Sequence, residues 1–119
     1  MARIVTALCL ILFMASPALA CGVMEKAYPK VGSIVEPTDH ITLTFTKAIV
    51  QGSNSIKITD ASGNEVKAGK PVSSDDDTVL SLKTDHLLAP GKYKVLWNVI
   101  WQDCNSKTQG DYKFTIRKE

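Results

Sequence analysis

The chain has 119 residues, 14 of them basic and 12 acidic, and its formal net charge is +2. This length allows one domain, and the balanced charge argues against nucleic acid or an anionic membrane as a partner. Arg3, the apolar run 8–14 and the cleavage motif at 17–20 (PALA), with small residues at Ala18 and Ala20, predict a secretory signal peptide over residues 1–20. We therefore expect an exported domain of residues 21–119, located in the periplasm.

Residues 21–119 carry a β-strand pattern throughout. Residues 23–35 predict one or two short edge strands broken by Pro29 and Gly32. Further strands are predicted over 41–46, 55–59, 79–83, 92–101 and 112–116, with turns at 60–64 and 89–91. No segment of this region is long and apolar enough to insert into a membrane. Short strands with frequent turns predict an all-β fold, an antiparallel β-sandwich of two sheets.

The longest predicted strand has two apolar faces. Tyr93, Trp97 and Trp101 share one face, which we assign to the core, and Leu96 and Ile100 lie on the other. This pattern indicates a central strand that is buried on both sides. The turn at 89–91 followed by Tyr93 is also typical of a tyrosine corner.

No group of residues in the sequence has the pattern of an active site. Two histidines, His40 and His86, follow aspartates in predicted turns, where solvated loop histidines are common. The acidic run 75–77 lacks the spacing of a calcium loop, and we interpret it as a solvated loop before the strand at 79–83. The sequence therefore indicates a protein that is not an enzyme.

Cys21 and Cys104 are the two cysteines that remain after signal cleavage, and they allow two interpretations. They could act as thiolates, together with Asp103 and the free amine of Cys21, in a site for Cu(I) or zinc. Alternatively, they could form a disulfide that ties the N-terminus to the loop before the last strand. An oxidising compartment favours the disulfide. Acylation of Cys21 is less favoured, because Ala18 is small for the position three before a lipidated cysteine.

Four segments taken in order resemble the CopC family of periplasmic copper-resistance proteins: 28–33 (YPKVGS), 41–46 (ITLTFT), 88–97 (LAPGKYKVLW) and 109–116 (QGDYKFTI). The resemblance implies an Ig-like antiparallel β-sandwich or Greek-key barrel of about seven strands. It also implies copper binding without catalysis, in copper resistance or delivery. We expect the protein to be a monomer. A CopD-type inner-membrane copper transporter is the implied partner.

The residues at the family's ligand positions differ in this chain. The family's N-terminal histidine falls on Cys21, its aspartate on Asp103 and its second histidine on Asn105, and the methionine-rich segment is missing. Cys21, Asp103 and Cys104 are therefore the expected metal ligands, with Cu(I) favoured over Cu(II). The alternative is a disulfide-stapled module, joined by Cys21 and Cys104, that has lost copper binding. Such a module would interact with a periplasmic or membrane protein.

Overall fold

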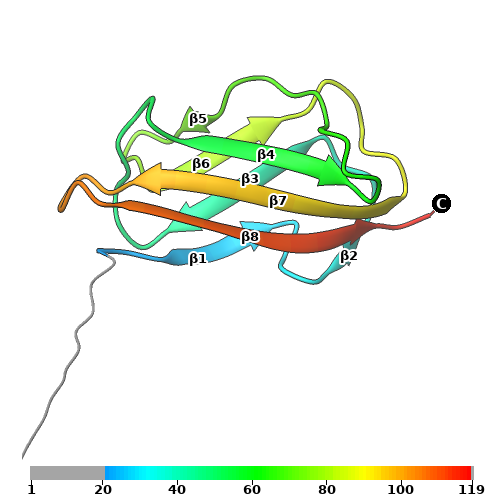
Figure 1. Cartoon of the computed structure of the whole chain (residues 1–119), viewed down its shortest axis with the longest axis horizontal. Helices are drawn as coiled ribbons and strands as arrows, with labels where there is room; N and C mark the ends of the chain where they lie inside the picture. The colour runs from blue at the N-terminus through cyan, green and yellow to red at the C-terminus, as the bar shows by residue number, and fades with distance from the viewer. Residues whose placement is uncertain (1–20, 119) are drawn as a thin grey trace, which may run out of the picture.

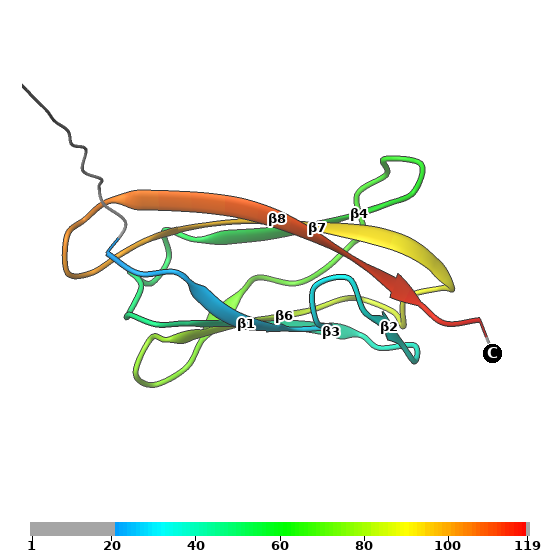
Figure 2. The same cartoon turned by 90° about the horizontal axis from the view of Figure 1, so that it is seen from below.

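Two four-stranded β-sheets pack face to face in a computed structural model that describes residues 21–118 (Figure 1). One sheet has the strand order β1-β3-β6-β5 and the other β2-β8-β7-β4. The strands are β1 (Met24–Tyr28), β2 (Ile34–Val35), β3 (His40–Phe45), β4 (Ser55–Asp60), β5 (Val72–Ser73), β6 (Val79–Lys83), β7 (Gly91–Ile100) and β8 (Lys107–Ile116). The predicted signal peptide lies outside the described residues. Figure 2 shows the two layers edge on.

The core lies between the sheets and is built from the alternating apolar residues. Its largest fully buried side chains include Trp101, Phe114, Ile41, Leu43 and Ile58, all 0–2 % exposed. The Tyr93 hydroxyl donates a hydrogen bond of 2.7 Å to the Ala89 carbonyl. The predicted sandwich, core aromatics and tyrosine corner are thus confirmed.

Strand details depart from the sequence prediction in three places. There are eight strands, because β2 and β5 are two-residue segments, and β2 pairs in parallel with β8. The last strand begins at Lys107, five residues before its predicted start, because it pairs with β7 along its whole length. The prediction of a β7 buried on both sides was wrong. Leu96 and Ile100 are only half-buried, because within residues 21–118 no second layer covers that face.

The acidic run folds as predicted into a loop before β6. Asp76 Oδ1 accepts hydrogen bonds from the Ser74 hydroxyl (2.8 Å) and from the hydroxyl and backbone N–H of Thr78 (2.8 and 3.2 Å). These bonds, the Thr78 hydroxyl first, lower the pKa of Asp76. Within residues 21–118 the structure has no helix that could cross a membrane.

Candidate functional site

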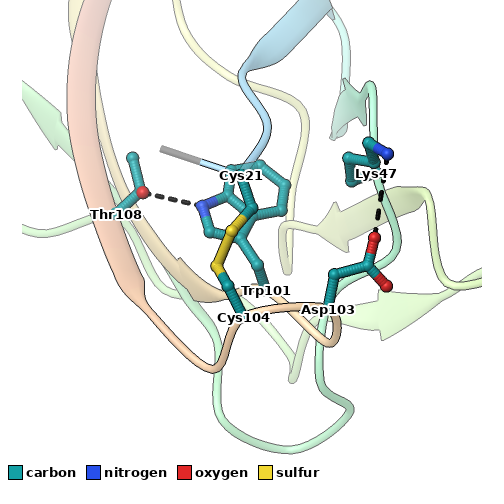
Figure 3. Close-up of a disulfide and its surroundings, with 6 residues drawn as sticks. All are labelled: Cys21, Lys47, Trp101, Asp103, Cys104 and Thr108. Carbon is teal, nitrogen blue, oxygen red and sulfur yellow. Dashed lines mark hydrogen bonds and ion pairs between the residues drawn. A yellow bond between two sulfur atoms is a disulfide. The ribbon is translucent and has the colours of Figure 1, made fainter. Parts of the chain in front are cut away.

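The two cysteines of interest meet at one end of the sandwich and form a disulfide (Figure 3). Cys21 lies just before β1, and Cys104 lies in the turn between β7 and β8. Their Cα atoms are 6.3 Å apart, although 83 residues separate them in the sequence. In this oxidised state each sulfur is bonded to the other, so neither is a thiolate ligand. The assignment of both as metal ligands stays a prediction for the reduced protein.

The N-terminal segment lies directly against the buried indole of Trp101. A Cβ on Gly22 would sit 3.0 Å from Trp101 Cζ3, 3.0 Å from Thr46 Oγ1 and 3.0 Å from Lys47 Cγ, so a larger residue here would force these side chains to shift. The next residue, Val23, donates its N–H to Thr46 Oγ1 (3.0 Å) and accepts from the Thr46 N–H (3.0 Å). These contacts position Cys21 independently of the sulfur bond.

The turn that carries Cys104 is held by its own hydrogen bonds. Trp101 N–H donates to the Ser106 carbonyl (2.9 Å), and Asn105 N–H donates to the Trp101 carbonyl (2.8 Å). Asn105 adopts φ = 61°, a left-handed conformation that asparagine tolerates better than most residues. The Trp101 indole N–H donates to Thr108 Oγ1 (2.7 Å), which fixes the ring under the disulfide. These hydrogen bonds therefore fix the backbone on both sides of Cys104.

Asp103 faces away from the disulfide. Its carboxylate lies 3.7 Å from the Lys47 ammonium, and both side chains are more than half exposed. Figure 3 shows this carboxylate directed to Lys47, on the side of the turn opposite the sulfurs. Within residues 21–118, no three His, Cys, Asp or Glu side chains are arranged to hold a metal ion. The structure therefore brings Cys21 and Cys104 together and leaves Asp103 outside that pair.

The two histidines lie away from this end of the molecule. His40 is at the start of β3, opposite to the Thr46 end of that strand, and its ring stacks on Tyr28 at 5.2 Å. Beside it, Asp39 accepts a hydrogen bond from Lys83 (2.7 Å), which is the main cause of the lowered pKa of Asp39. His86 is exposed in the loop between β6 and β7.

Gly22 and Lys47 are the site residues that the sequence did not indicate. The requirement for Gly22 comes from the Trp101 ring, which is 79 positions away in the sequence. Lys47 follows a predicted strand, and nothing in the neighbouring sequence identifies it as the ion-pair partner of Asp103. Only the positive φ of Asn105 has a sequence signal, because asparagine is favoured in turns.

The tyrosine corner and the two packed sheets define this chain as an immunoglobulin-like β-sandwich. The model of the CopC domain matches residues 24–117, so the chain belongs to the CopC family and the predicted resemblance is confirmed. No curated protein matches the sequence.

Solved structures with the same fold include PcoC, CopC and a surface layer protein. PcoC from Escherichia coli, a methionine-rich copper resistance protein, is 23% identical at a TM-score of 0.73, covering 82% of this chain and 100% of that one. CopC from Methylosinus trichosporium OB3b is 26% identical at a TM-score of 0.71, covering 80% and 92%. The surface layer protein SbsC is 14% identical at a TM-score of 0.61, and the match covers 82% of this chain and 14% of that one.

Proposed function

We propose that this chain is a non-catalytic, periplasmic copper-binding protein that serves copper resistance or delivery. Membership of the CopC family is the observation that carries this proposal. The similarity to PcoC and CopC adds support, because the first is described as a copper resistance protein. The signal-peptide pattern of residues 1–20 supports export.

The ligands of this proposal are Cys21 and Cys104 in their reduced form. A dithiol reductant would transfer two electrons and two protons to the disulfide, which breaks the sulfur–sulfur bond and leaves two thiols. Cu(I) would then displace the thiol protons and bind the two thiolates, which are soft ligands suited to this ion. The Cα distance of 6.3 Å keeps both groups at one place for this binding.

Asp103 and the amine of Cys21 would complete the set of copper ligands. Asp103 has to leave Lys47 to approach the sulfurs, and an exposed ion pair of this kind holds it weakly. The amine becomes free when the signal peptide is removed. We propose a CopD-type inner-membrane copper transporter as the partner that exchanges copper with this site.

The second candidate is a disulfide-stapled module that has lost copper binding. Two observations favour it: Cys21 and Cys104 are bonded to each other, and asparagine stands at the family's second histidine position. In this case the CopC-like domain would act by binding a periplasmic or membrane protein.

A native mass spectrum of the protein purified from a periplasm tests both candidates. Copper uptake is expected after treatment with a phosphine reductant and Cu(I), with one ion per chain. Cys104→Ser is expected to abolish this uptake, whereas His86→Ala, which changes an exposed loop residue, retains it. A reduced chain that takes up no copper would overturn the first candidate and favour the stapled module. Retained uptake in Cys104→Ser would overturn the ligand assignment.

A further inference from the structure

The outer face of the strands β4, β7 and β8 carries a concentration of lysines. In each strand most of the alternate residues that face inward are buried, so the residues between them face outward. Five of these outward residues are lysines, here called the lysine face: Lys57, Lys92, Lys94, Lys107 and Lys113.

This face is strongly basic although the chain as a whole is nearly neutral. Among its outward strand residues only Asp111 is acidic, so five lysines and one aspartate give a local charge of +4, against +2 for all 119 residues. Among the described residues, the single ion pair within the face joins Lys94 to Asp111 at 3.9 Å. A further carboxylate, that of Asp60 at the end of β4, borders the face beside three of its lysines. Its Oδ1 accepts the backbone N–H groups of Ser62 and Asn64.

The arrangement of the lysines is not one that strand stability favours. Lys94 and Lys113 are directly opposite each other on paired strands, where like charges repel. The outer face of the other sheet presents different residues to solvent. Its outward positions on the central strands β3 and β6 carry three hydroxyl residues, Thr42, Thr44 and Ser81, and one lysine, Lys83, which is paired with Asp39. Cross-strand pairing therefore does not account for the lysine face.

The charge and the low apolar content of the lysine face favour one kind of binding partner. Its outward apolar side chains Leu96 and Ile100 are only partly exposed, and the exposed Ile34 lies beside it on the neighbouring strand β2, so the face offers few of the aromatic and aliphatic anchors typical of protein interfaces. Lysine is also depleted in such interfaces, because its ammonium is costly to desolvate. The surface is open, with a shallow hollow of about 390 Å³ whose lining includes Lys57, Leu96 and Asn98. We propose that the lysine face docks on the anionic headgroups of a phospholipid membrane.

This docking needs no apolar insertion. Each lysine near an anionic bilayer contributes attraction that falls off within the Debye length, so several lysines on one plane act together. With the lysine face on the membrane, the turn between β7 and β8 lies at one end of the sandwich (Figure 2), and Cys104 in this turn is exposed. The inference depends on the distribution of charge and is independent of whether the protein binds copper.

Sedimentation with phospholipid vesicles tests this inference. The probes are phosphatidylcholine vesicles with and without phosphatidylglycerol. The test variant is Lys57→Gln/Lys92→Gln/Lys113→Gln, which leaves the Lys94 pair intact. The matched control is Lys26→Gln/Lys67→Gln/Lys70→Gln, which removes the same charge from strand β1 and from the loop that pairs with β6. Thermal unfolding verifies that both variants fold.

The expected result is binding to the anionic vesicles at low salt and none to neutral vesicles. The test variant should bind about 100-fold more weakly and the control within about threefold of the unchanged protein, as expected for lysines at and away from the contact. No binding to anionic vesicles would overturn the inference, as would an equal loss in the two variants. Binding to an acidic polypeptide such as polyglutamate without binding to vesicles would also overturn it, in favour of an acidic protein partner.

Discussion

The disulfide between Cys21 and Cys104 should supply a large share of the stability of the domain. It joins residues 83 positions apart, so it closes nearly the whole described chain into one loop. In the chain-entropy treatment, this cross-link stabilises the fold by about 4.5 kcal/mol, because it restricts the unfolded ensemble. The total unfolding free energy of such domains is about 5–15 kcal/mol. Loss of the cross-link would therefore remove a large fraction of the free energy of unfolding.

Urea unfolding of the oxidised protein and of Cys21→Ala/Cys104→Ala measures this contribution. We expect a loss of about 3–4.5 kcal/mol, which allows for structure retained in the unfolded chain. The dependence of the free energy on urea should become steeper in the variant, because its unfolded chain exposes more surface. Ser106→Ala, in the same turn, is the control that leaves the sulfur bond intact.

A small effect would refute the reasoning. If the variant loses less than about 1 kcal/mol and its urea dependence is unchanged, the cross-link does not restrict the unfolded chain as the entropy treatment requires. The backbone bonds between Val23 and Thr46 would not account for such a result. They hold the folded state, whereas the predicted effect arises in the unfolded one.

Three further changes test the packing of the core. Gly110→Ala should cost about 1–3 kcal/mol in urea unfolding, because its Cβ would lie 2.7 Å from Trp97 Cζ2. Gly69→Ala is the control and should cost nothing, since the atom nearest to its Cβ would be the Lys83 carbonyl oxygen at 3.8 Å. Tyr93→Phe should cost about 1 kcal/mol through its lost hydrogen bond, measured in the same way. The Tyr112 hydroxyl is buried without a partner in the described part of the chain, so Tyr112→Phe should be neutral or stabilising. Burial raises the pKa of Tyr112, so the unfolded state loses its proton first and stability should fall above about pH 10. Unfolding at increasing pH should show a smaller fall for the phenylalanine variant.

The sequence predicted the parts of the fold that hydrophobic alternation specifies. Strand β7 and the second half of β8 have a strict inward pattern, and both were located correctly. The first half of β8 is polar and gave no such signal. It is a strand because β7 already provides a pairing edge, and because Trp97 packs over Gly110 and Trp101 bonds to Thr108. These are tertiary contacts, which a local pattern cannot contain.

The candidate site was predictable in its residues but not in its chemistry. Two cysteines in an exported domain could bond to each other or to a metal, and their spacing of 83 residues does not decide between the two. The pairing of Asp103 with Lys47 depends on how the turn after β7 faces the end of β3. The position of this turn follows from the packing of the two sheets, and it cannot be predicted from the sequence near Asp103 or Lys47.

The contacts around the disulfide relate the two candidate functions to each other. Gly22 on Trp101 and the hydrogen bonds of the turn at 101–106 hold both cysteine-bearing segments without the sulfur bond. Reduction should therefore lower stability mainly through the unfolded state and leave the two thiols adjacent in the folded one. A Cu(I) ion bound to both thiolates would restore a cross-link between the same two residues, and with it much of the lost stability, because it binds the folded state preferentially. The stapled module and the copper protein would thus share one scaffold and differ in what joins Cys21 to Cys104.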